Sequence, residues 1–149
     1  MKILFTASEC VPFVKTGGLA DVVGALAPVL AKQGHDVRVI VPMYTVIDEK
    51  YQSQMEFVLH FDVQLGWRRQ YCGIFEAHID GVIYYLLDNQ YYFKRGSLYG
   101  FYDDAERFAF FSRAILEIIP HIGFKPDIIH CNDWQTGLIP VYLHDSFEQ

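Results

Sequence analysis

The sequence is poor in cysteine, and the few that it has are badly placed for cross-linking or for binding zinc. Its 149 residues include three cysteines, Cys10, Cys72 and Cys131, an odd number with wide spacing and no C-x-x-C pair. Disulfide-rich secreted domains and cysteine-based zinc sites need paired or closely spaced cysteines. We therefore expect neither, and a reducing cytoplasm is the simplest setting for the chain.

Long hydrophobic runs, repeats and low-complexity tracts are also missing. The apolar stretch after Met1-Lys2 is too short for the core of a signal peptide, and no run approaches the length that crosses a bilayer. A net charge of −6 without a dense basic stripe argues against a nucleic-acid surface. We expect no membrane or nucleic-acid partner, and one domain over residues 1–149.

A basic glycine loop, Lys-Thr-Gly-Gly-Leu-Ala-Asp at residues 15–21, is the most informative motif that is present. It follows an apolar run and opens an amphipathic segment, so we expect it to join a strand to a helix. Glycines let amides approach a ligand, and a helix N-terminus favours an anion. With Lys15 before Gly17 and Gly18, the loop predicts a phosphate site; a plain tight turn is the structural alternative.

Strands and helices are expected to alternate along the chain. Hydrophobic periodicity predicts strands at 2–7, 36–41 and 126–131, helices at 20–33, 103–120 and 134–144, and an antiparallel insertion over residues 55–88. Asp80-Gly81 indicates a hairpin in that insertion, and Pro28 is expected to kink the first helix. The predicted fold class is α/β, a Rossmann-like doubly wound parallel sheet with an antiparallel β insertion.

Ligands of such sheets bind beyond the carboxyl ends of the parallel strands. This rule selects two loops, residues 8–19 and 130–136. The polar residues in or beside them are Glu9, Lys15, Asp21, His130 and Asp133. We predict that these side chains lie along one rim of the sheet.

Each of these polar residues also has a purely structural explanation. Asp21 suits the first turn of a helix, Asp133 suits the cap of a helix that starts at Trp134, and Glu9 suits a solvated loop. His130 and Asp133 fall short of the three or four ligands of a usual metal site. We therefore expect no metal, and a strand-end histidine with satisfied hydrogen bonds is the simpler interpretation of His130.

Three ordered blocks of the sequence resemble bacterial glycogen synthases and plant starch synthases. They are ASECVPFVKTGGLAD at residues 7–21, continued by GHDVRV at 34–39, DDAERFAFFSR at 103–113, and PDIIHCNDWQTGL at 126–138. The resemblance implies the GT-B fold, with two Rossmann-like domains and an active site in the cleft between them. The chain would then be a partial N-terminal domain that lacks the C-terminal nucleotide-binding domain of the same protein, and it would be inactive alone.

The resemblance also implies a reaction and its participants. Members of this family transfer glucose from ADP-glucose, or UDP-glucose in some members, to the non-reducing end of an α-1,4-glucan with retention of configuration and without a cofactor. Carried over to matching positions, the roles are catalytic for Asp133 and Asp21, and substrate-binding for Lys15, Thr16, Gly17, Gly18, Glu9 and His130. Lys15 would contact the nucleotide-sugar phosphates, and Glu9 and Asp133 would border the sugar.

Aromatic residues between positions 84 and 102 suggest contact with carbohydrate, because flat rings stack on sugars; the core of the insertion is the alternative. Within this stretch we predict glucan contact for the loop from Phe93 to Tyr99. No residue is an evident nucleophile with its own base, since G-x-S-x-G and a close Cys-His pair are both missing. This is compatible with a retaining transfer that needs no covalent glycosyl-enzyme.

Two other classes of protein remain open at this level. A stand-alone flavodoxin-like module would use the glycine loop to hold a phosphate without transfer chemistry, but Glu9 lacks the acidic neighbours expected of a receiver domain. A nicotinamide-dependent dehydrogenase should carry the three-glycine dinucleotide fingerprint, which Gly17-Gly18 does not provide.

Overall fold

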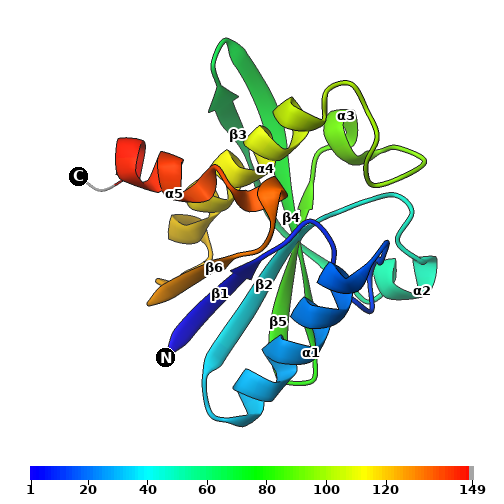
Figure 1. Ribbon diagram of the computed structural model, residues 1–149, viewed down its shortest axis with the longest axis vertical. Helices are drawn as coiled ribbons and strands as arrows, with labels where there is room; N and C mark the ends of the chain where they lie inside the picture. The colour runs from blue at the N-terminus through cyan, green and yellow to red at the C-terminus, as the bar shows by residue number, and fades with distance from the viewer. Residues whose placement is uncertain (148–149) are drawn as a thin grey trace.

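The computed structural model describes residues 1–147 and contains one six-stranded sheet (Figure 1). The strand order is β3-β4-β5-β2-β1-β6. In chain order the strands are β1 (Lys2–Thr6), β2 (Asp36–Pro42), β3 (Glu56–Leu65), β4 (Arg68–Ile79), β5 (Val82–Asp88) and β6 (Ile128–Cys131). The helices are α1 (Gly18–Lys32), α2 (Glu49–Gln52), α3 (Gln90–Phe93), α4 (Asp104–Ile118) and α5 (Ile139–Tyr142).

The parallel part of the sheet, β5-β2-β1-β6, confirms the predicted doubly wound arrangement. β1 lies next to the edge strand β6 and pairs in parallel with β2 on one side and β6 on the other. α1 lies on one face of the sheet and α4 on the opposite face (Figure 1). The direction of strand progression therefore reverses between β1 and β6, and such a switch point is where open α/β sheets bind ligands.

The predicted antiparallel insertion is also confirmed, at the edge of the sheet. β3 pairs with β4 and β4 pairs with β5, both antiparallel. Asp80 and Gly81 form the two-residue turn between β4 and β5, with φ angles of 51° and 77°. Two successive positive φ angles are those of a type I′ hairpin, for which an Asp-Gly pair is favoured.

One expectation about helices needs correction, and another is met. α1 runs from Gly18 to Lys32 with Pro28 inside it, as the predicted helix at 20–33 requires, and the kink at Pro28 stays a prediction. The predicted single helix over 134–144 is wrong: a 3₁₀ turn at Trp134–Thr136 is followed by the short α5 and a π-helical turn at Leu143–Phe147. Pro140 explains the break, because its missing N–H cannot bond back to the preceding turn and it is tolerated only at the start of a helix.

Gly24 of α1 lies against the loop that carries the glycine motif. A Cβ atom added at Gly24 would lie 2.9 Å from the carbonyl oxygen of Val11, and Val11 donates its own N–H to the Ala20 carbonyl. Gly24→Ala is therefore expected to lower the free energy of unfolding by about 1–3 kcal/mol, although alanine favours a helix. Urea unfolding measures the change. Gly96→Ala is the control, because no atom lies within 4 Å of its added Cβ; a Gly24→Ala protein as stable as the parent would contradict the close contact.

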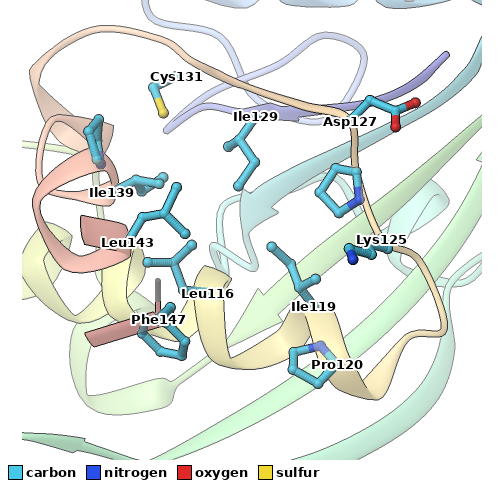
Figure 2. Close-up of a pocket in the computed structure, with 12 residues that line it drawn as sticks. Leu116, Ile119, Pro120, Lys125, Asp127, Ile129, Cys131, Ile139, Leu143 and Phe147 are labelled. Carbon is cyan, nitrogen blue, oxygen red and sulfur yellow. The ribbon is translucent and has the colours of Figure 1, made fainter. Parts of the chain in front are cut away.

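A wide apolar cavity of about 560 Å³ lies beside the edge strand β6. Figure 2 shows side chains from α4, β6 and α5 converging on it, among them Leu116, Ile129 and Ile139. Its lining is mostly hydrocarbon, and it lacks the cluster of polar groups found at the β1–β6 rim. Separately, none of the helices within residues 1–147 has the length and apolar character needed to traverse a bilayer.

Candidate active site

The loops that follow β1 and β6 leave the same edge of the sheet side by side. Thr6 at the end of β1 pairs with Cys131 at the end of β6. Beyond that pair, the Thr6 carbonyl accepts hydrogen bonds from both the backbone N–H and the side-chain amide of Asn132, each at 3.1 Å. The predicted rim is therefore a real feature of the molecule, and Asn132, which no motif argument singles out, joins its two halves.

Glu9 is the centre of the first loop and is almost completely buried, with 2% exposure. Its carboxylate accepts hydrogen bonds from the Thr16 hydroxyl at 2.5 Å, the Gly17 N–H at 3.1 Å, the Thr16 N–H at 3.3 Å and the Tyr99 hydroxyl at 2.8 Å. The structure thus corrects the view of Glu9 as a solvated loop residue. It ties the glycine loop and the loop that contains Tyr99 to the end of β1.

These hydrogen bonds decide the charge state of Glu9. Burial by itself would raise the pKa of Glu9, but the donors from Thr16, Tyr99 and Gly17 together lower it below the usual value. The carboxylate is therefore ionised at neutral pH. An ionised carboxylate is the best acceptor for four converging donors.

A lowered pKa in the folded state means that Glu9 stabilises the fold above its unfolded pKa of about 4.3 and loses that contribution as pH falls through the folded value. Glu9→Gln is expected to lower the free energy of unfolding by about 1–2 kcal/mol at pH 7, because a neutral amide is a weaker acceptor. The gap between the two proteins should narrow progressively below pH of about 4. Urea unfolding of both proteins from pH 7 to pH 3 measures it, and a gap that stays constant with pH would contradict the assigned charge.

The direction of the loop amides differs from the expectation for a phosphate loop. The N–H groups of Thr16 and Gly17 point inward to Glu9, so they are not available to an external anion. α1 begins at Gly18, and no side chain caps its N-terminus within the described residues. Since the first amides of a helix have no intrahelical partner, the free donors begin at Gly18.

Gly17 and Gly18 face open space. A Cβ atom added at either position would meet nothing within 4 Å. The backbone at Gly17 is extended, with φ of −164°, so it does not require glycine for its conformation. The packing of this chain therefore does not require glycine at either position, and the space beside them is open to an approaching group.

Lys15 and Asp21, two of the predicted site residues, contact each other beside this helix end. Their Nζ and Oδ2 atoms lie 2.7 Å apart, and both side chains are about half exposed, at 52% and 51%. An exposed ion pair contributes only about 0–1 kcal/mol to stability. Lys15 can therefore exchange Asp21 for another anion at small cost.

Tyr99 connects the loop before α4 with the rim. Its hydroxyl lies 2.8 Å from Glu9 and 2.6 Å from the Ser8 hydroxyl, while the Tyr44 hydroxyl donates to the Ser8 carbonyl at 2.7 Å. Burial, and the hydrogen bond to Glu9, raise the pKa of Tyr99 far above its usual value, so its hydroxyl stays protonated and donates to the carboxylate. The negative charge of Asp133 adds to the rise in the pKa of Tyr99.

Phe93, the other aromatic residue predicted to contact glucan, is in the core. It has no exposed surface and packs edge-on against Tyr44 at 5.6 Å and Phe111 at 6.3 Å between ring centroids. Its position at the end of α3 turns the ring into the hydrophobic layer under α4. The ring face is covered, so it is not available to stack on a sugar.

Asp133 adopts an unusual backbone conformation for an aspartate. Its φ and ψ are 65° and −176°, in a region that is essentially restricted to glycine and costs about 1–3 kcal/mol for other residues. Its Oδ1 accepts the Trp134 N–H at 2.7 Å, which confirms the predicted capping interaction. Asp133 is nevertheless exposed, in the loop that follows β6.

His130 is the last but one residue of β6, and it is exposed. The ring lies edge-on to Phe5 with centroids 4.9 Å apart, and the Asn132 side-chain amide lies 3.4 Å from its Nδ1. His130 and Asp133 therefore flank Asn132 on one loop. Within residues 1–147 no three His, Cys, Asp or Glu side chains gather closely enough to hold a metal ion.

Arg107 is a supporting residue that the motif analysis does not single out. It is fully buried, and its guanidinium donates to the carbonyls of Tyr92 at 2.7 Å and Leu98 at 2.8 Å and to Asp104 at 2.8 Å. The Leu98 carbonyl precedes Tyr99, so Arg107 fixes the segment that presents Tyr99 to Glu9. The sequence does carry a signal for this role, because helical periodicity places Arg107 among phenylalanines on the face of α4 that should be buried.

Comparison with known proteins identifies the family of this chain. The family model described as starch synthase catalytic domain matches residues 2–149. Relatives include the glycogen synthases of Clostridium botulinum (strain Alaska E43 / Type E3), 59% identical over 96% of this chain, of Clostridium kluyveri, 58% identical over 100%, and of Geobacillus stearothermophilus, 55% identical over 99%. The chain spans about 30% of the length of these curated relatives.

Among solved structures, the catalytic domain of starch synthase IV from Arabidopsis thaliana bound to ADP and acarbose is similar, with a TM-score of 0.89 and 32% identity. The match covers 97% of this chain and 30% of that one. The mixed sheet and this likeness are consistent with the N-terminal half of a GT-B glycosyltransferase. The chain belongs to the starch synthase catalytic domain family.

Proposed function

We propose that this chain is the N-terminal part of a glycogen or starch synthase. The enzyme would transfer glucose from ADP-glucose to the non-reducing end of an α-1,4-glucan with retention of configuration. Relatives named glycogen synthase at 55–59% identity support the activity. The similar starch synthase, solved with ADP and acarbose, supports a nucleotide-sugar donor and an oligosaccharide acceptor.

The observation that carries the proposal is the basic, uncapped start of α1 at the switch point of the sheet. Lys15 stands at this helix end, its ion pair with Asp21 is exposed, and Gly18 opens onto free space. Negative charge develops on the leaving diphosphate as the bond to the sugar breaks. Donors and cations placed in advance, here Lys15 and the first amides of α1, stabilise that charge in the transition state.

The remaining site residues take roles around the sugar. Asp133 would present its exposed carboxylate beside the carbon on which positive charge builds, with His130 on the same loop. Glu9 does not need to touch the sugar, because its buried carboxylate holds Thr16 and Gly17 in place. Asp21 would hold Lys15 while no phosphate is bound and release it when the donor arrives.

Activity is proposed for the whole enzyme rather than for this segment. The chain covers about 30% of its relatives, and the adenine or uracil of the donor would bind to the C-terminal domain of the same protein. We expect the 149-residue chain alone to be inactive with ADP-glucose and glycogen. The three free thiols suit a cytoplasmic enzyme, and no cofactor is required.

The test is glucosyl transfer by the full-length protein from ADP-glucose and from UDP-glucose onto glycogen, together with ligand-induced melting shifts for both donors, NAD and acetyl phosphate. Transfer with a melting shift for a sugar nucleotide is the expected result. A selective shift with NAD would favour a dehydrogenase. A shift with acetyl phosphate and no transfer would favour a phosphate-binding module.

Gly18→Ala separates ligand approach from folding. The added methyl group meets no atom of this chain, and alanine favours a helix by up to about 1 kcal/mol, so stability should be unchanged or slightly higher. The same methyl group would stand over the free amides of α1, and donor affinity should fall about tenfold. Thermal melting and ADP-glucose titration of the full-length protein measure the two effects. Unchanged affinity in a folded variant would remove the α1 N-terminus from the donor site.

A further inference from the structure

The outer strand of the insertion, β3, is an open edge of the sheet. It stands first in the strand order, so it pairs only with β4 (Figure 1). Its ten residues include neither lysine nor proline, which commonly protect an edge strand from pairing with another chain. Phe57 and Val58 at its start are 51% and 41% exposed. A long edge of this kind favours the addition of a further strand.

The turn between β3 and β4 determines which backbone groups of β3 face outward. Leu65 pairs with Arg68 across a two-residue turn, and Gly66 has a φ of 59°, as the first residue of a type II′ turn requires. The pair that flanks such a turn exchanges hydrogen bonds, and this exchange recurs at every second residue. The even-numbered residues from 60 to 64 therefore direct their N–H and C=O groups away from the sheet. No loop of residues 1–147 covers these groups with backbone hydrogen bonds.

A second copy of the same strand fits this edge in one register. Two antiparallel β3 strands related by a twofold axis must pair even-numbered with even-numbered residues, because only these offer free backbone groups. With the axis at Phe61, His60 of each copy lies opposite Asp62 of the other, and an imidazole N–H can donate to a carboxylate. Moving the axis by one residue places two His60 or two Asp62 side chains face to face instead, and two opposed carboxylates repel each other.

Both side chains are available for this contact. His60 is exposed and its ring stacks on Tyr71 with centroids 5.6 Å apart, and within residues 1–147 no hydrogen bond reaches its ring nitrogens. The side chain of Asp62 is 47% exposed, and Arg69 donates to its Oδ2 at 3.2 Å. Oδ1 is left for a further donor. The imidazole and the carboxylate are thus partly held in place by their own chain, with capacity left for a partner.

On the other face of β3, the same axis brings two aromatic pairs together. Phe61 is half-buried and stacks on His121 with ring centroids 4.9 Å apart. Directly opposed side chains of an antiparallel pair lie about 4.5–5.5 Å apart at Cβ, so the two Phe61 rings would meet on the axis and cover each other. We propose that β3 pairs with β3 of a second copy of this protein, in a twofold dimer that joins the two sheets into one.

Sedimentation equilibrium of the full-length protein over a range of concentrations tests the association. We expect a reversible dimer in the micromolar range, because one strand pair is small beside the roughly 1,200–2,000 Å² interfaces of stable complexes. Asp62→Lys should weaken dimerisation at least about tenfold, since it removes the acceptor of His60 and adds a lysine to the edge. Glu49→Lys is the matched control: it makes the same change of charge at an exposed position of α2 and should dimerise like the parent. Thermal melting checks that both variants are folded.

Cysteine substitutions report the register. With oxidised glutathione, a mixture of His60→Cys and Asp62→Cys proteins should form a disulfide-linked dimer, because residues paired in this way lie about 5.5 Å apart at Cα, within reach of a disulfide. Neither variant should cross-link alone, because each new cysteine would lie about 7–8 Å from its counterpart. The parent protein is the background control for the three native thiols.

The outcomes distinguish this inference from the proposed function. A full-length protein that stays monomeric without cross-links, as when another segment of the same protein covers β3, would overturn the interface. A dimer that Asp62→Lys leaves intact would also overturn it. Cross-linking of Asp62→Cys alone, or of Asp62→Cys mixed with Gln64→Cys, would reject the axis at Phe61. The predicted dimer in a protein that transfers no glucose would uphold the interface and reject the proposed function.

Discussion

Arg107→Leu is expected to lower the free energy of unfolding by about 3–5 kcal/mol, the largest loss of stability for any single residue considered. The guanidinium of Arg107 is fully buried and donates to the Tyr92 and Leu98 carbonyls and to Asp104. Leucine would fill much of the space but would leave these acceptors unpaired, and breaking a buried charged network from one side costs this much. Urea unfolding measures the loss.

The environment of Arg107 explains how a charge is tolerated in this core. Rings of Phe93, Phe101 and Phe108 lie 5.6, 4.9 and 5.2 Å from the guanidinium carbon. Such contacts attract a desolvated cation. One nitrogen, Nη2, is buried without a hydrogen-bond partner among residues 1–147, so the rings compensate for an incomplete set of acceptors.

The control for Arg107 is Arg69→Leu. Arg69 is paired with Asp62 at 3.2 Å, but its side chain is 74% exposed, and its replacement should change stability by less than about 1 kcal/mol. Arg107→Leu should also raise the KM for the donor in the full-length enzyme, because the Leu98–Tyr99 segment positions Glu9 and thereby the glycine loop. Equal effects of the two substitutions would contradict a supporting role for Arg107.

The sheet and its rim could be predicted from the sequence because local signals and global rules agree there. Apolar runs define the parallel strands, Asp80-Gly81 specifies the hairpin, and the rule for switch points then selects the loops after β1 and β6. Pro140 breaks the last predicted helix because the apolar periodicity around it favours a helix while its missing N–H prevents one. That conflict is visible in the sequence, but periodicity alone does not resolve it.

The hydrogen bonds and the burial of the site residues could not be predicted, because they depend on contacts between residues far apart in the chain. Tyr99 reaches Glu9 across 90 positions, so nothing near Glu9 indicates that it is buried or that it takes up the Thr16 and Gly17 amides. The sequence also does not distinguish Phe93 from Tyr99, two aromatic residues of one predicted loop. Only the packing under α4 decides that Phe93 faces inward. The sequence indicated which loops meet at the rim, and tertiary structure decided which of their side chains are buried and which are exposed.

Lys15→Ala is expected to reduce kcat/KM of the full-length enzyme for ADP-glucose by about 10²–10³-fold, the loss typical of removing one preorganised donor to developing negative charge. With the Thr16 and Gly17 amides committed to Glu9, Lys15 and the first amides of α1 are the donors that this segment offers to a diphosphate. Removing the lysine should hardly affect folding, because its ion pair with Asp21 is half exposed. Steady-state kinetics and thermal melting measure both quantities.

Lys32→Ala is the matched control for Lys15→Ala, since Lys32 is an exposed lysine in the last turn of the same helix, far from the N-terminal amides. It also removes one positive charge from the protein, so a general electrostatic effect on a polyanionic donor would appear in both variants. The loss of a direct contact with the phosphates would appear only in Lys15→Ala. Lys15→Arg should recover part of the activity, because arginine restores the positive charge on a side chain of different length and shape. If Lys15→Ala keeps donor affinity and turnover, the diphosphate binds elsewhere, and the open space at Gly18 then needs another occupant.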